Sequence, residues 1–397
     1  MLAASLFLFS PAVQAASFKT TSKTIYTFPA SVASDLVPMT PNFSIVGDQF
    51  ICNRLAAKWV PSLIYNGKEI NDHFKYMYIE PKFSPDGKNY VYFVSYNDNR
   101  KNASNYHVVL NGKEYFNYKN VSGANFVFSG NSKHNAFPAT DTDNGKMFIV
   151  YDRKEQIKYD FVSAPSLSPD GKTLAYAANN KKYKKKILII NNKVIGSYED
   201  VKAPVVFSPN SKHLAYAVKD GNWSIYVDNK KVASGYDNVD NILVDNSAKY
   251  AFIGRKGNSY AANINGKESA KYPDVSNLVI SPDGKQSAFI ARNSGNSETA
   301  VVNGKEGVSY PIFMGVPVFS PDSKHLAYKT SRFTSDGKSR IFLFIIDGKE
   351  MTANGWYYNA FYQSSGMYSE FTFSADSHYL FYYSKVDNKI VKNTVSL

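Results

Sequence analysis

The sequence has one cysteine, Cys52, among 397 residues. A single cysteine cannot form an intramolecular disulfide, and it excludes zinc and iron–sulfur sites built from several cysteines. No uninterrupted apolar stretch reaches the roughly 18 residues of a membrane-spanning helix. No window shows the 3.6-residue apolar period of an amphipathic helix either. These absences exclude a polytopic membrane protein and a mainly helical domain.

Recognised catalytic motifs are also missing, since there is no GxSxG elbow, HExxH pair, Walker loop or GxGxxG. His134, His213 and His325 each follow the lysine of a repeated turn and are expected on the second strand, strand B, of three different units. They should therefore not lie around one metal ion. Residues 141–145 resemble a calcium loop but lack its later glutamate, and a turn between two strands explains them better. We predict no catalytic residues, no cofactor and no metal.

Acidic residues are outnumbered, with 33 Asp and Glu against 46 Lys and Arg, which gives a formal net charge of +13. Such an excess can attract nucleic acid, anionic lipid or an acidic glycan. The lysines here recur largely at the same turn positions of a repeat, where dispersed charge keeps a β-rich protein soluble and protects strand edges. A nucleic-acid partner is therefore not expected.

The first residues have the features of a secretory signal. An apolar core at 2–9 is followed by Pro11 and by small residues up to Ala16, which predicts a signal peptide over 1–16. Its basic region is missing, which suggests that the signal begins further upstream; a soluble N-terminal strand is the alternative. We expect an exported bacterial protein, periplasmic or extracellular, whose residues 17–397 form one domain.

One turn sequence recurs along the chain. FSPDGK at 83–88 returns as LSPDGK, FSPNSK, ISPDGK and FSPDSK at 167–172, 207–212, 280–285 and 319–324, with weaker copies near residues 43, 128, 244 and 373. The mean spacing of about 41 residues is typical of four-stranded propeller blades.

A second turn, NGKE or DGKE, occurs at 66–69, 111–114, 265–268, 303–306 and 347–350, with looser versions at 152–155, 191–194 and 228–231. Both turns suit tight hairpins, because Gly, Asn and Asp tolerate positive φ. Short apolar segments between the turns, such as 187–190, complete four strands per unit, A to D. The fourth strand ends near a Tyr-x-x-Val sequence, as at 198–201 and 236–239.

The unit resembles the WD40-like Pro-Asp repeat of the TolB-type β-propeller and of related exported bacterial propellers. The resemblance extends from about Phe43 to the end and is carried by the copies at 83, 167, 280 and 319. It implies an all-β fold, a single β-propeller of four-stranded blades. No separate domain like the one before the TolB propeller is recognisable.

The repeat count predicts nine blades, with eight as the alternative if the unit at Phe43 is irregular. The last unit has strands A, B and C but no fourth. Residues 24–32 are strand-like and precede the first complete unit. We therefore predict that this N-terminal strand completes the last blade.

Propeller topology places the A–B and C–D turns on one face, and the B–C loops and D-to-A crossovers on the other. The second face carries the variation in loop length, and variable loops on a rigid scaffold are where binding usually resides. The candidate partner-binding residues there fall into three groups: Lys182, Tyr183, Lys184 and Lys185; Arg332 and Arg340; and Trp356, Tyr357, Tyr358, Phe361, Tyr362 and Tyr368.

Each group has a structural alternative. The lysines could form a solvated hairpin tip, the arginines an ordinary polar hairpin, and the aromatic residues could pack on the rim of the propeller. The function that we predict is a non-catalytic, monomeric binding scaffold for a protein or peptide, or for an anionic polymer. The alternative is a propeller lyase or hydrolase that acts on a glycan or peptide in a central funnel.

Overall fold

The computed structural model describes most of the repeats. The described residues are 18–27, 43–46, 49–56, 60–66, 68–70, 81–98, 103–118, 120–121, 125–179, 185–334, 336–352, 371–386 and 389–397. They contain β-strands and turns but no α-helix, and within these ranges no helix could cross a bilayer. The all-β prediction is confirmed.

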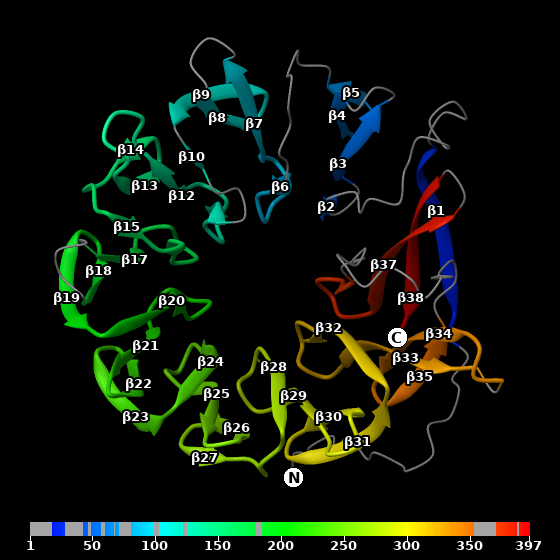
Figure 1. Cartoon of the computed structure of the whole chain (residues 1–397). Helices are drawn as coiled ribbons and strands as arrows, with labels where there is room; N and C mark the ends of the chain where they lie inside the picture. The colour runs from blue at the N-terminus through cyan, green and yellow to red at the C-terminus, as the bar shows by residue number, and fades with distance from the viewer. Residues whose placement is uncertain are drawn as a thin grey trace. The chain divides into compact units, whose positions relative to one another are not determined.

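The chain divides into two compact units, residues 28–234 and residues 1–27 with 235–397, and each is described by itself. The described strands form nine antiparallel sheets, numbered here in chain order (Figure 1). Four sheets belong to the unit 28–234: sheet 1, β2 (Phe43–Val46), β3 (Gln49–Ala56), β4 (Val60–Tyr65), β5 (Lys68–Ile70); sheet 2, β6 (Lys82–Phe83), β7 (Tyr90–Asp98), β8 (Ala103–Leu110), β9 (Lys113–Tyr118); sheet 3, β10 (Asn120–Val121), β11 (Val127–Phe128), β12 (Asn135–Thr140), β13 (Met147–Tyr151), β14 (Lys154–Glu155); sheet 4, β15 (Phe161–Val162), β16 (Ser166–Leu167), β17 (Leu174–Asn179), β18 (Lys186–Ile190), β19 (Lys193–Tyr198).

Sheet 5 has its last strand at the boundary between the units, and sheets 6 to 9 belong to the second unit. The strands are: sheet 5, β20 (Asp200–Phe207), β21 (Leu214–Asp220), β22 (Asn222–Val227), β23 (Lys230–Tyr236); sheet 6, β24 (Asn238–Val244), β25 (Tyr250–Lys256), β26 (Ser259–Ile264), β27 (Lys267–Glu268); sheet 7, β28 (Asp274–Ile280), β29 (Ser287–Arg292), β30 (Glu298–Val302), β31 (Lys305–Tyr310); sheet 8, β32 (Ile312–Phe319), β33 (Leu326–Phe333), β34 (Arg340–Ile346), β35 (Lys349–Thr352); sheet 9, β36 (Thr372–Phe373), β37 (Tyr379–Val386), β38 (Lys389–Ser396) and β1 (Thr20–Thr27). Consecutive antiparallel sheets of four or five strands give the chain a propeller-type fold, as predicted.

The two repeated turns form hairpins because their residues accept left-handed backbone. In the C–D turn of sheet 2, Asn111 and Gly112 have φ values of 52° and 73°. Positive φ at both corners is the geometry of a two-residue hairpin that matches the twist of the strands. Residues 141–146 connect β12 and β13, so the calcium-like sequence is a B–C turn, as expected.

The apolar core lies between consecutive sheets. Ile290 of sheet 7 packs in one cluster with Tyr328 and Leu343 of sheet 8, and all three side chains are buried. Ile149 of sheet 3 and Tyr176 of sheet 4 share a similar cluster. Because neighbouring sheets within each unit bury their faces against one another in this way, stability is distributed over several interfaces of the same kind.

Strand β1 supplies the fourth strand of sheet 9, which confirms the prediction for the N-terminal strand. It runs antiparallel to β38, with Thr20 opposite Val395 and Thr27 opposite Lys389. The predicted bounds are corrected: the strand begins at Thr20 instead of Thr24, because β38 offers partners as far as Val395. Residues 28–32 lie outside the described residues.

Candidate functional site

Buried serines organise the A–B turns. Ser320 is fully buried, and its Oγ donates to Asp322 Oδ1 at 2.6 Å and accepts from the backbone N of His325 at 2.9 Å. The same Ser–Asp contact is present in the A–B turns of sheets 2, 4, 7 and 9. The aspartates of the SPDGK repeat therefore have the structural role expected from the sequence.

These contacts favour the charged carboxylate. Burial alone would raise the pKa of Asp322, but hydrogen bonds from Ser320 and from the backbone N of Lys324 outweigh burial and lower the pKa to about 2. A carboxyl whose pKa is lower in the folded state stabilises the fold fully above its unfolded pKa. That stabilisation is lost as the pH falls from about 4 towards 2.

The copies with Ser in place of Gly link neighbouring turns. The hydroxyl of Ser132 in sheet 3 accepts a hydrogen bond from the backbone N of Asp86 in sheet 2, at 3.0 Å. Ser211 and Ser323 make the equivalent contacts with the preceding sheets, at 2.9 and 3.0 Å. The sequence identifies FSPNSK and FSPDSK as variants of the turn but does not indicate this contact between sheets.

The Tyr-x-x-Val and NGKE sequences also meet across sheets. Tyr272, which follows sheet 6, donates to Glu306 Oε1 of sheet 7 at 2.8 Å. Tyr310 takes the same position in sheet 7, with Phe313 in place of the valine, and donates to Glu350 of sheet 8 at 3.1 Å. Burial raises the pKa of Tyr272 to about 12, and its hydrogen bond to Glu306 adds to the rise. Each phenol therefore remains a hydrogen-bond donor at neutral pH.

Replacing Tyr272 by Phe should lower the free energy of unfolding by about 1.5 kcal/mol, because a hydrogen bond to a charged acceptor is lost. Urea denaturation would measure the change. Tyr379→Phe is the matched control, since the Tyr379 side chain is 41% exposed. An equal loss of stability in both variants would contradict a specific contribution from the contact between Tyr272 and Glu306.

Three histidines connect the two hairpins within their own sheets. Nδ1 of His134 lies 2.5 Å from Asp152 Oδ2, and the His213–Asp228 and His325–Asp347 pairs are 2.7 and 2.6 Å apart. Each histidine lies one residue before strand B, so the prediction that they lie on that strand is corrected. Among the described residues, no group of three His, Cys, Asp or Glu side chains could hold a metal ion.

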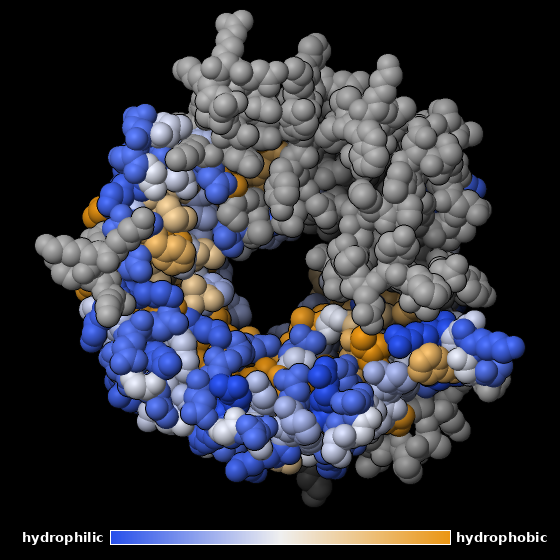
Figure 2. Space-filling view, in the orientation of Figure 1, coloured by the Kyte–Doolittle hydropathy of each residue, from blue (hydrophilic) through white to orange (hydrophobic). Residues whose placement is uncertain are grey.

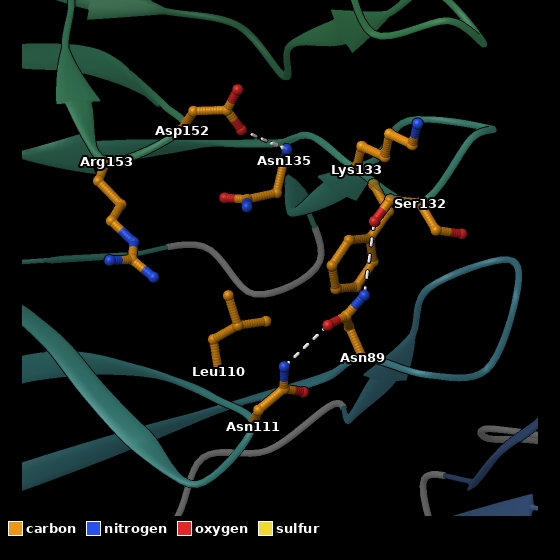
Figure 3. Close-up of a pocket in the computed structure, with 9 residues that line it drawn as sticks. Asn89, Leu110, Asn111, Ser132, Lys133, Asn135, Asp152 and Arg153 are labelled. Atoms are coloured by element: carbon orange, nitrogen blue, oxygen red, sulfur yellow. Dashed lines mark hydrogen bonds between the residues drawn. The ribbon is translucent and has the colours of Figure 1, made fainter.

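A pocket of about 330 Å³ lies between sheets 2 and 3, beside their A–B and C–D hairpins. Its polar lining is the side chains of Asn89, Asn111, Ser132, Lys133, Asn135, Asp152 and Arg153, and its apolar lining is Leu110 and Phe128. Figure 3 places Arg153 across the pocket from Asn89. A site was not predicted on this face, because the variation in loop length lies on the opposite face.

The predicted lysine group is described only at Lys185. Its ammonium lies 3.8 Å from Asp220 Oδ1, and both side chains are more than half exposed. An exposed ion pair of this kind contributes little to stability. Lys182, Tyr183 and Lys184 lie outside the described residues, as does the predicted aromatic group, which consists of Trp356, Tyr357, Tyr358, Phe361, Tyr362 and Tyr368.

The predicted arginines lie on the B–C hairpin formed by β33 and β34. Arg340 lies over the ring of Phe333, 5.0 Å from its centre, and this ring is 48% exposed. Nε of Arg332 lies 3.4 Å from Glu350 Oε2. The hairpin therefore presents an aromatic ring and a guanidinium together, and the sequence had given no sign that Phe333 would join the arginines.

Hydrogen bonds connect the described residues at the tip of this hairpin. The backbone N of Gly337 donates to the carbonyl of Thr334 at 2.8 Å, and Asp336 Oδ1 accepts from the backbone N of Lys338 at 3.1 Å. These are the contacts of an SPDGK turn, here formed by a TSDGK sequence.

The space-filling view shows mainly hydrophilic residues on the described surface, with apolar residues in scattered spots (Figure 2).

No protein-family model and no curated protein matches this sequence. Solved structures do resemble it. A crystal structure of the eukaryotic initiation factor has a TM-score of 0.49 at 14% identity, over 84% of this chain and 90% of that chain. TolB from Acinetobacter baumannii has a TM-score of 0.32 at 15% identity, over 74% and 77%. The propeller domain of the Trilobed protease from Pyrococcus furiosus has a TM-score of 0.39 at 15% identity, over 71% and 96%. At these values the matches carry no argument about function.

Proposed function

We propose that this protein is an exported, non-catalytic binding scaffold that holds a protein or peptide partner on its variable B–C loops. The observation that carries the proposal is the pair of Phe333 and Arg340 on the β33–β34 hairpin. Exposed aromatic and arginine side chains on a rigid support are the residue types that dominate binding energy at protein interfaces. Hydrogen bonds already hold the described residues at the tip of this hairpin, which lowers the loss of conformational entropy when a partner binds.

The contacts of the repeat aspartates and of the His–Asp pairs support a non-catalytic role. The repeat aspartates accept hydrogen bonds in their turns, and His134, His213 and His325 are each paired with an aspartate of the same sheet. A general base must be able to reach a substrate proton. In these pairs the carboxylate instead joins two hairpins, so a structural role accounts for the histidine and the aspartate.

Replacing Phe333 by Ser in the full chain should weaken partner binding at least tenfold, because the aromatic anchor is lost. Partners would be captured from envelope extracts by crosslinking and identified by mass spectrometry. The affinity of each purified partner would then be measured by interferometry. Ser at this exposed position leaves the core unchanged.

Phe161→Ser is the matched control. Phe161 is 40% exposed, and Lys186 lies over its ring at 5.8 Å, so this variant also removes an exposed aromatic ring that contacts a cation. Partner binding should survive in the control and be lost in Phe333→Ser. Equal binding by both variants would show that the β33–β34 hairpin is not the binding surface.

A further inference from the structure

The pocket between sheets 2 and 3 lies where two repeat positions carry smaller side chains than the next sheet does. At the equivalent place between sheets 3 and 4, the ring of His134 packs against Gly171, and the hydroxyl of Tyr151 donates to the Gly171 carbonyl at 2.6 Å. In sheet 2, Asn89 takes the position of His134, and Leu110 takes that of Tyr151. The smaller side chains leave a hollow where the next sheet is closely packed.

The lining of this hollow combines one strongly directional cation with several amides. Arg153 offers a planar guanidinium, which binds a carboxylate through two parallel hydrogen bonds. Asn89, Asn111 and Asn135 each carry an amide that both donates and accepts, as sugar hydroxyls also do. The Nδ2 of Asn111 donates to Oδ1 of Asn89 at 2.8 Å, which fixes the orientation of these two amides (Figure 3).

The other lining groups are compatible with an acidic, hydroxylated ligand. Lys133 adds a second positive charge at the pocket. Asp152 is the acidic residue of the lining, and its carboxylate accepts from the backbone N of Asn135 at 3.0 Å and contacts His134. Phe128 provides an apolar surface of the kind on which the C–H face of a sugar ring rests.

We propose that this pocket binds a sugar acid, a monosaccharide unit that carries a carboxylate. Arg153 binds the carboxylate, the three asparagine amides bind hydroxyl groups, and Phe128 contacts the ring. A volume of about 330 Å³ is in the range of small-molecule sites. The site lies at the A–B and C–D hairpins and is independent of the Phe333 hairpin, so either proposal can fail without the other.

Titration calorimetry on the full chain tests the ligand class with glucuronate, galacturonate, glucose and inorganic phosphate. The uronates should bind at least tenfold more tightly than glucose, which lacks the carboxylate, and than phosphate, which lacks the hydroxylated ring. Phosphate binding as tight as uronate binding would overturn the proposal in favour of a plain anion site. Absence of uronate binding would also overturn it.

Arg153→Asn removes the guanidinium without disturbing the turn. Asn192 and Asn229 occupy the same turn position in sheets 4 and 5, with φ values of 63° and 64°, close to the 69° of Arg153. Uronate affinity should fall at least tenfold in this variant. Lys230→Asn removes one positive charge from the C–D turn of sheet 5 and should leave the affinity unchanged.

A second variant fills the hollow by copying the next sheet, with Asn89→His, Leu110→Tyr and Asn111→Asp combined. The new His–Asp pair reproduces the contact between His134 and Asp152, so the variant should fold and lose uronate binding. Full uronate affinity in either this filled variant or Arg153→Asn would show that the ligand binds elsewhere and would overturn the proposal.

Discussion

Replacing Ser168, Ser281 and Ser320 together by alanine is expected to lower the free energy of unfolding by about 6 kcal/mol. Each hydroxyl is buried, donates to an aspartate at 2.6 Å and accepts a backbone N–H at 2.9 Å. Each replacement leaves a carboxylate and a buried N–H without this partner, at a cost of about 2 kcal/mol. The three serines lie in different sheets and share no hydrogen-bond partner, so their effects should add.

Urea denaturation of the single and triple variants would measure these effects. Ser247→Ala is the control, because Ser247 is an exposed residue in an irregular copy of the turn. The pKa of Asp322, followed by carboxyl NMR in Ser320→Ala, should rise from about 2 towards its ordinary value. A triple variant that loses less than about 2 kcal/mol would contradict the role given to the buried hydroxyls.

Deleting residues 1–27 is expected to destabilise sheet 9 by an amount on the order of 5 kcal/mol, in comparison with deletion of residues 1–17. The longer deletion removes β1, which pairs with β38 from Thr20 to Thr27. It also removes Ser22, whose Oγ donates to Asn393 at 2.7 Å, and exposes the edge of β38 next to the buried Val395. An open edge of this kind promotes aggregation.

Hydrogen exchange of the β38 amides would locate the effect. Exchange should accelerate after the longer deletion, and addition of a peptide with the sequence of β1, TTSKTIYT, should slow it again. Equal stability and equal exchange in the two truncated proteins would show that β1 contributes nothing to sheet 9.

Much of the fold follows from sequence, because turn chemistry is local. Positive φ at Asn111 and Gly112 depends on those two residues alone, so the recurrence of NGK predicts hairpins wherever it appears. The predicted start of β1 was wrong by four residues, because the extent of a strand depends on how far its partner strand extends. That partner, β38, lies at the other end of the chain.

The contacts between sheets could not be predicted in the same way. The contact between Tyr272 and Glu306 joins two repeat motifs that are 34 residues apart, and the sequence of one motif does not show that it contacts the other. The pocket lies in space that the side chains of Asn89 and Leu110 leave open. This is recognised only by comparison with His134 and Tyr151, which take the same positions in the next sheet. The exposure of Phe333 and its contact with Arg340 were not predicted, because no sequence pattern distinguishes an exposed aromatic residue from a buried one.

The pairing of β1 with β38 sets an order of events in folding. Ser22 and Asn393, which meet in sheet 9, are separated by 371 positions along the chain. Pairing of β1 with β38 has to close a much longer segment of chain than a contact such as that between Tyr272 and Glu306, which joins neighbouring repeats. Sheet 9 is therefore expected to form after the contacts between neighbouring repeats.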